Sequence, residues 1–126
     1  AYAMARTPLI TLVSGSAYGS VFSVFGSKAI GADIVFAVDT AKIGCMSAKS
    51  AVALLWNDQI TKDTTRGDLE AKWDAEVASA VSAARAGEID DIIESAEIRQ
   101  RLASAVLMLS GKSVAAPRRR HANMPL

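Results

Sequence analysis

The residues best placed to do chemistry lie near the start of the chain, where a strand meets a helix. Residues 9–14 are mostly apolar, as in a strand covered on both faces, and residues 15–20 follow as a turn of small residues. The first N–H groups of a helix have no partner within it and carry the positive end of its dipole. Gly19 lets a ligand approach the backbone closely. The pattern therefore predicts that the N–H groups of Gly19, Ser20 and Val21 bind a carbonyl oxygen or an oxyanion.

A purely structural role for this turn is the alternative. Gly19 would then only allow a helix to pack closely on a sheet, as glycines before helices commonly do. Other reactive side chains are weaker candidates. Cys45 beside Met46 is expected to be a small buried hydrophobe. Adjacent strand residues point to opposite faces, so Asp90 and Asp91 are expected to bind neighbouring backbone and not to form an acid–base pair.

Composition argues against several kinds of site. The 126 residues carry 14 basic and 13 acidic side chains, and this balance leaves no field to attract nucleic acid or an anionic membrane. His121 and Cys45, far apart in sequence, are a poor basis for a metal site or a Ser–His–Asp triad. One cysteine cannot form an internal disulfide, which favours a reducing, cytoplasmic location. No apolar run approaches the roughly 20 residues that a membrane span needs.

Strands alternate with helices in the first half of the chain and the second half is mainly helical, which indicates an α/β fold. The spacing of Tyr18, Phe22, Phe25 and Ala29 predicts one helical stripe, ended by Gly31. Further strands are expected at residues 33–38, 42–46 and 89–93.

Capping residues mark the helices that follow. Ser47 is expected to cap a helix that runs through Trp56, and Thr65 with Asp68 resembles a capping box with Asp in place of Glu. The helix after this box is predicted to continue to about Arg85, before Gly87. Its buried face is expected to carry Leu69, Trp73, Val77 and Val81.

The two ends of the chain follow different patterns. Ser95 is expected to cap a last helix, with Gly111 at its end. Its inward residues are expected to be Ile98, Leu102, Val106 and Leu109. Residues 1–6 look like the last turns of a helix ended by Thr7-Pro8. The chain would then begin within an element, as a fragment or one half of a split protein, and residues 117–126 would form an irregular basic tail.

Several strings occur in an order that is typical of one family. They are residues 17–22 (AYGSVF), 26–28 (GSK), 31–33 (GAD), 40–43 (TAKI), 87–93 (GEIDDII) and 117–126 (PRRRHANMPL). Together they resemble the C-terminal part of the carboxyltransferase subunit of biotin-dependent acyl-CoA carboxylases, such as the propionyl-CoA carboxylase β chain. Related decarboxylases look similar. The likeness covers essentially the whole chain, and its ending is the most specific part.

The resemblance implies a crotonase-like (ClpP/crotonase) α/β fold built from ββα units. Residues 1–126 would be the C-terminal, biotin-side domain, without the N-terminal half that binds CoA. As part of a larger complex, this enzyme would move a carboxyl group between carboxybiotin, held on a biotin carboxyl carrier protein, and an acyl-CoA. Backbone N–H donors would stabilise charge on the biotin ureido oxygen, with no metal. The implied partners are the CoA-binding half, the carrier protein and further copies of the chain, because the family forms hexamers.

The resemblance also assigns residues to the site. The family's ureido donors lie at a Gly-Ala pair that matches Ser20-Val21, directly after Gly19. The acyl substrate pocket is expected at Phe22 and Ser23. The biotin pocket is expected at Thr40, Ala41, Ile43 and Met46.

Three departures from the family leave the substrate and the direction of reaction open. Gly-Gly-Ala is replaced by Gly19-Ser20-Val21, which keeps the backbone donors and narrows the pocket. Trp-Pro-Thr-Ala-Glu is replaced by residues 38–42, where Lys42 reverses a charge, and residues 46–51 lack two glycines. One alternative is a decarboxylase subunit that runs the same half-reaction backwards. Another is an assembly module that keeps the fold and the oligomer contacts without catalysis.

Overall fold

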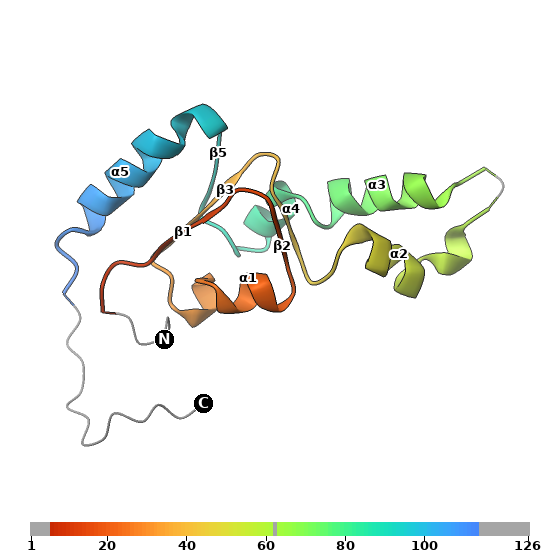
Figure 1. Ribbon diagram of the computed structural model, residues 1–126, viewed down its shortest axis with the longest axis horizontal. Coiled ribbons are helices and arrows are strands. Elements are labelled where there is room, and N and C mark those ends of the chain that lie inside the picture. The colour runs from red at the N-terminus through yellow and green to blue at the C-terminus, as the bar shows by residue number, and fades with distance from the viewer. Residues whose placement is uncertain (1–5, 62, 114–126) are drawn as a thin grey trace, which may run out of the picture.

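The computed structural model describes residues 6–61 and 63–113. Within these ranges five strands form two parallel sheets. β1 (Ile10–Val13), β3 (Ile34–Val38) and β5 (Asp91–Ile93) form the larger sheet, in the order β1-β3-β5. β2 (Ser16–Tyr18) and β4 (Lys42–Gly44) form the smaller one. Parallel neighbours require a crossover connection, and helices lie in each crossover of the larger sheet (Figure 1).

Two pairs of strands run side by side from the larger sheet into the smaller one. β1 and β3 pair with Ile10 opposite Ile34, and their continuations β2 and β4 pair with Ser16 opposite Lys42. The Lys42 N–H also donates to the Gly15 carbonyl at 3.1 Å, so the pairing continues through the bend. Two consecutive strands followed by helix are the ββα unit expected from the sequence.

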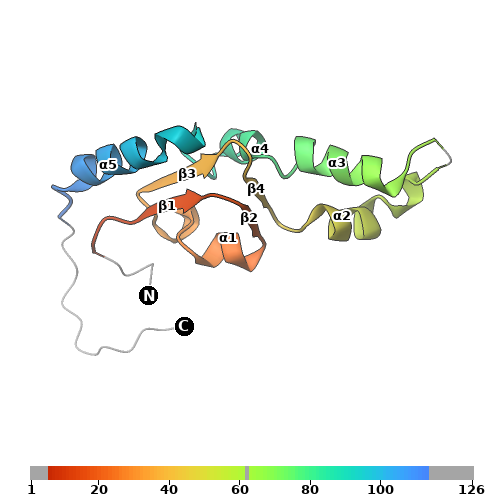
Figure 2. The same ribbon diagram turned by 45° about the horizontal axis from the view of Figure 1, so that its top comes forward.

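The larger sheet is covered on both faces. Val35 and Ala37 of β3 pack in one cluster with α4 (Ala80–Arg85) and Phe22 of α1 (Ser20–Val24). Phe36 packs on the other face with Ala105 of α5 (Ile98–Leu109). Figure 2 shows α5 and α1 on opposite sides of the sheet. Because neighbouring strand residues point to opposite faces, this arrangement explains the mostly apolar sequences of β1 and β3.

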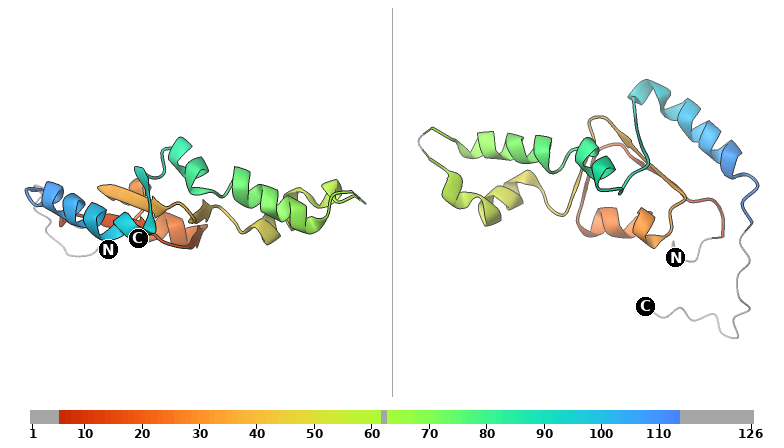
Figure 3. Two further views of the ribbon diagram at one scale, coloured as in Figure 1. Left: turned by 90° about the horizontal axis from the view of Figure 1, so that it is seen from above. Right: turned by 180° about the vertical axis from the view of Figure 1, so that it is seen from behind.

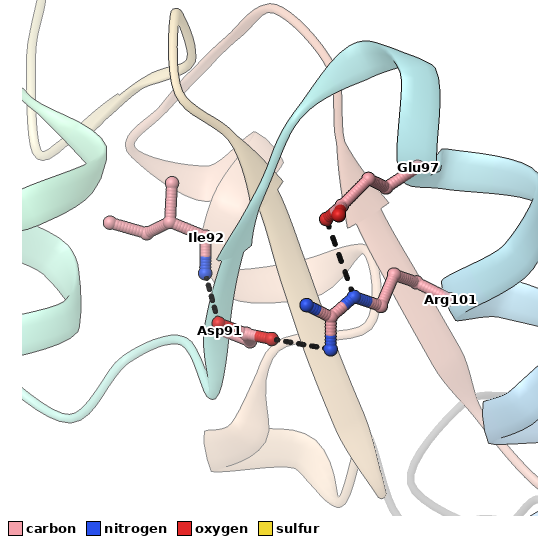
Figure 4. Close-up of polar contacts among 4 residues, drawn as sticks. All are labelled: Asp91, Ile92, Glu97 and Arg101. Carbon is pink, nitrogen blue, oxygen red and sulfur yellow. Dashed lines mark hydrogen bonds and ion pairs between the residues drawn. The ribbon is translucent and has the colours of Figure 1, made fainter.

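Polar contacts near the start of α5 tie it to β5. The Arg101 guanidinium lies 3.7 Å from the Asp91 carboxylate and 3.4 Å from that of Glu97 (Figure 4). Ser95 does not cap this helix as predicted: it begins a 3-10 turn (Ser95–Glu97) that leads into α5, and no side chain caps the helix. Val106 is 58% exposed, so the buried stripe passes through Ala105 instead.

A helical hairpin projects from one end of the sheets (Figures 1 and 3). It consists of α2 (Ala48–Leu55), a 3-10 turn (Asn57–Gln59) and α3 (Arg66–Glu76). Both predicted caps are confirmed, since Ser47 accepts a hydrogen bond from the Ser50 N–H and Thr65 forms a capping box with Asp68. The rings of Trp56 and Trp73 meet edge to face at 5.1 Å between centroids. Ala48, Ala51 and Ala78 pack beside Trp73.

The predicted small-residue turn and the helix after it differ from the structure. Residues 16–18 form β2, because a partner strand lies beside them. The helix ends at Val24 and does not continue to Gly31, and Phe25 is 62% exposed. The Thr11 hydroxyl donates to the Gly26 carbonyl at 2.7 Å, and Gly26 has a positive φ of 82°. This contact with β1 leads the chain out of the helix into a short 3-10 turn (Lys28–Ile30), which Gly31 ends in the left-handed conformation.

The long helix predicted after Thr65 is two helices, α3 and α4. The Ala78 carbonyl accepts a hydrogen bond from the Ile43 N–H at 2.9 Å, and Ser79 forms a β-bridge with Lys42. The chain therefore leaves the helix to bond to β4, and the side chain of Ser79 then caps α4. Val77 and Val81 are 39% and 49% exposed, so the predicted buried face ends at Trp73. Gly87, with φ of 75°, follows α4 as expected.

The strands β4 and β5 are shorter than predicted. β4 ends at Gly44, where the chain turns towards α2, and β5 begins at Asp91 because Asp90 serves as an anchor before it. The predicted helical start covered residues 1–6, of which Arg6 is described and is not helical, while residues 1–5 lie outside the described residues, as does the tail at residues 117–126. No helix within the described part of the chain combines the length and apolar character needed to cross a membrane.

Candidate oxyanion site

The Gly19 turn has a backbone conformation that only glycine adopts readily. Gly19 has φ 56° and ψ −127°, and a Cβ placed on it would lie 3.1 Å from the Cys45 carbonyl oxygen. Its N–H donates to the Gly44 carbonyl at 2.9 Å. The prediction that the Gly19 N–H binds a ligand is therefore wrong, since this donor is already used between β2 and β4. Gly19 contributes to the site through the backbone conformation that it gives the turn.

The N–H groups of Ser20 and Val21 have no partner among the described residues. They open α1, whose first internal hydrogen bond runs from the Ser23 N–H to the Gly19 carbonyl at 3.1 Å. Both residues are exposed, Val21 by 51%. Two adjacent donors at a helix start, on an exposed turn, can bind a carbonyl or anionic oxygen brought by another molecule.

The two residues predicted for the substrate pocket lie together in the structure. Phe22 and Ser23 line a cavity of about 150 Å³, whose other walls are Ser27, Lys28, Ala29 and Glu88. The Ser23 hydroxyl donates to the Gly19 carbonyl at 3.1 Å, and the Ser27 hydroxyl donates to the Ser23 carbonyl at 3.0 Å. These bonds attach the wall of the cavity to the turn that carries the two free donors.

The predicted biotin-pocket residues are divided between the core and the surface. Ala41 and Ile43 are 2% and 1% exposed, and their side chains pack within the sheet core. Thr40 is exposed, and Met46 is half-buried against the hairpin. Cys45 is exposed, contrary to the prediction of a buried hydrophobe.

The adjacent aspartates bind backbone, as predicted. Asp90 accepts from the Val35 N–H at 2.9 Å, and Asp91 accepts from the Ile92 N–H at 2.9 Å (Figure 4 shows the second contact). Lys28 and Arg101 pair with Asp90 and Asp91 respectively. These carboxylates stabilise the beginning of β5.

An ion pair beside the site was missed by the reasoning from sequence. The Lys42 ammonium donates to the Asp74 carboxylate, and this hydrogen bond raises the pKa of Lys42. Asp74 also lines a cavity of about 420 Å³ together with Tyr18, Ser47, Ala48, Lys49, Gly67, Glu70 and Ala71. The charge reversal at Lys42 was visible in the sequence and could have prompted a search for an acidic partner.

Paired ββα units with helices on both faces of the sheet define a crotonase-like fold of the carboxyltransferase type. The chain is 30% identical to transcarboxylase 12S, whose crystal structure shows a hexamer with methylmalonyl-coenzyme A bound; the TM-score is 0.84, over 99% of this chain and 24% of that one. Residues 1–124 match the model of the carboxyl transferase domain, and the chain belongs to this family.

The curated relatives include subunits named for a carboxylase and for a decarboxylase. The chain is 36% identical to the propionyl-CoA carboxylase carboxyltransferase subunit of Haloferax mediterranei, over 100% of this chain and 25% of the relative. It is 39% identical to the methylmalonyl-CoA decarboxylase subunit alpha of Propionigenium modestum, again over 100% of this chain and 25% of the relative. The chain therefore spans about a quarter of the length of these proteins.

Proposed function

We propose that the chain is the biotin-side, C-terminal domain of an acyl-CoA carboxyltransferase. The observation that carries the proposal is the pair of N–H groups at Ser20 and Val21, which find no partner within residues 6–61 and 63–113 and belong to exposed residues at the start of α1. The carboxyl group would move between carboxybiotin on a separate carrier protein and an acyl-CoA. The acyl-CoA would be held by an N-terminal half of similar fold.

The role of this chain in the reaction is to hold one oxygen atom. Carboxybiotin, when bound, would supply the carboxyl group, and the Ser20 and Val21 N–H groups would donate hydrogen bonds to its ureido oxygen. Such donors are oriented before the reaction, and removal of one from a known oxyanion hole costs about 2.7–4 kcal/mol of barrier. Gly19 contributes the shape of the turn, because its positive φ and its close approach to the Cys45 carbonyl oxygen both favour a residue without a Cβ. No nucleophilic side chain of this chain is required.

Contacts with the substrates and partners follow from the same geometry. The cavity beside Phe22 and Ser23 would receive part of the acyl group, and Thr40 with Met46 would contact biotin. The exposed apolar residues Phe25 and Leu107, at 62% and 76%, favour assembly with the CoA-binding half and with further copies of the chain. A cytoplasmic location completes the proposal, because a single thiol suits a reducing compartment.

A decarboxylase that uses the same site in the reverse direction is the second candidate. It is favoured by the 39% identity to the methylmalonyl-CoA decarboxylase subunit, which is similar to the 36% identity to the propionyl-CoA carboxylase subunit. Both directions need charge stabilisation at the same oxygen, so the N–H groups of Ser20 and Val21 would act alike in both.

The proposal is tested in the complete carboxyltransferase that contains this chain, with Val21→Pro compared against Val21→Ala. Proline is tolerated in the first turn of a helix and deletes one N–H, whereas alanine keeps it. Decarboxylation of malonyl-CoA or methylmalonyl-CoA with free biotin should fall about 10²–10³-fold in Val21→Pro and remain within a few-fold of the unmodified enzyme in Val21→Ala.

A correctly folded Val21→Pro enzyme with unchanged turnover would remove this donor from the mechanism. A stable complex without turnover, in the unmodified enzyme, would favour the assembly module. Comparison of the carboxylation and decarboxylation rates of the unmodified enzyme separates the two enzymatic candidates.

A further inference from the structure

We propose that Lys42 and Asp74 are positioning residues that hold the Gly19 turn in place from the helical hairpin. The ion pair joins β4 to α3 across 32 residues of sequence. Its effect on the reaction rests on the proposed function of the Ser20 and Val21 N–H groups. The coupling between the ion pair and the turn is a separate, structural claim that can be measured without turnover.

The hydrogen bonds of β4 provide the connection. Lys42 begins this strand, which pairs with β2 from Ser16 opposite Lys42 to Tyr18 opposite Gly44. At the end of the strand the Gly44 carbonyl accepts the Gly19 N–H at 2.9 Å. The Gly19 carbonyl in turn accepts the first internal hydrogen bond of α1. The direction of the Ser20 and Val21 N–H groups is therefore set by a turn that is bonded to β4.

β4 is packed closely against the Gly19 turn, so a small movement of β4 should also move the turn. The Cys45 carbonyl oxygen would lie 3.1 Å from a Cβ on Gly19, so the backbone after β4 is packed directly against the turn. On its other side β4 is bonded to the segment after α3, by the Ile43 N–H to the Ala78 carbonyl and by the bridge of Lys42 with Ser79. Because close-packed elements transmit small shifts, the position of α3 affects the turn.

The Lys42–Asp74 pair lies where it can control that position. Asp74 is in the last turn of α3, just before the chain leaves the helix to meet β4. Its side chain is 25% exposed, and its second carboxylate oxygen is buried without a hydrogen-bond partner in the described structure. A half-buried carboxylate that lost Lys42 would be drawn towards water. The end of α3, and β4 with it, would then shift.

The experiment uses the complete carboxyltransferase with Lys42→Met, Asp74→Asn and the conservative Lys42→Arg. We expect kcat to fall about tenfold in Lys42→Met and Asp74→Asn while KM for the acyl-CoA stays within twofold, because misplacement of a catalytic group affects the chemical step. Hydrogen exchange at the Gly19 amide should become faster in the same two variants. Lys42→Arg should restore both values.

Lys112→Met is the matched control. Lys112 pairs with Asp33 at 2.7 Å, and each side chain is 20% exposed. Asp33 otherwise forms hydrogen bonds with Leu9, which lies before β1 and away from the Gly19 turn in sequence. This variant should lower stability and leave kcat and Gly19 exchange unchanged. A folded Lys42→Met enzyme with unchanged Gly19 exchange would overturn the coupling, whatever its turnover. Faster Gly19 exchange with unchanged kcat would overturn the claim that the ion pair affects the reaction. An unmodified enzyme without turnover would overturn that claim and the proposed function together.

Discussion

The sheet body (residues 9–44 and 79–109) and the helical hairpin (residues 47–78) obtain their structure in different ways. Among the described residues, Ile43, Ile93 and Val35 of the body are three of the four largest side chains that are fully buried. Ile93 comes from β5, which is distant in sequence from β3 and β4, the consecutive strands that carry Val35 and Ile43. The body is therefore held by long-range packing, which no single segment can supply.

The hairpin is specified mainly by local signals. Ser47 and Thr65 cap its two helices with bonds to residues three positions ahead, and Trp56 and Trp73 pack edge to face between them. The buried side-chain atoms without a hydrogen-bond partner in the described residues, on Trp73 and Asp74, are both in this hairpin. We infer that the hairpin forms readily and opens more easily than the body, and that the site needs both regions.

The largest effect on stability is expected from a substitution that leaves a cavity in the core of the sheet body. Ile43→Ala should lower the free energy of unfolding by about 2–5 kcal/mol, because it removes a side chain that is 1% exposed in the main core. Denaturant unfolding measures this change. Val81→Ala is the control, since Val81 is 49% exposed and its loss should cost no more than about 0.5 kcal/mol. Similar values for the two variants would contradict the packing of β4 described above.

A smaller and more local effect is expected in the hairpin. Thr65→Ala removes the cap of α3 and should cost about 1 kcal/mol, with faster hydrogen exchange confined to α2 and α3. Thr64→Ala is the control, because the Thr64 side chain makes no hydrogen bond within the described residues. If Thr65→Ala increased exchange equally in β1 and β3, the hairpin and the body would be one cooperative unit.

The smallest effect concerns acid stability at the edge of the body. The Leu9 N–H, at 2.8 Å, and then Lys112 lower the pKa of Asp33. A carboxyl whose pKa is lower in the folded state stabilises the protein above its unfolded pKa of about 3.9 and loses this contribution as pH falls through the folded value. The stability difference between the unmodified protein and Asp33→Asn should therefore be constant near pH 6 and shrink below about pH 4. Unfolding curves at several pH values measure it, and a difference that grows in acid would contradict the ion pair.

Local sequence determined the features whose hydrogen bonds join residues close in the chain. The capping box at Thr65 and Asp68 and the cap at Ser47 are both confirmed, and each depends on groups only a few residues apart. The mostly apolar strands β1 and β3 were also predicted correctly, since burial on both faces demands such sequences.

Tertiary structure decided where the helices and strands end and which backbone N–H groups remain available to a ligand. β2 exists because β4 lies beside it, and the helix after Thr65 breaks at Ala78 because the Ile43 N–H takes the Ala78 carbonyl. The Gly19 N–H is used in the pairing of β2 with β4, so among the described residues the predicted donors without a partner are those of Ser20 and Val21. A hydrogen bond to a strand some 25 to 35 residues away leaves no periodic trace in either segment, and for this reason only the folded chain reveals it.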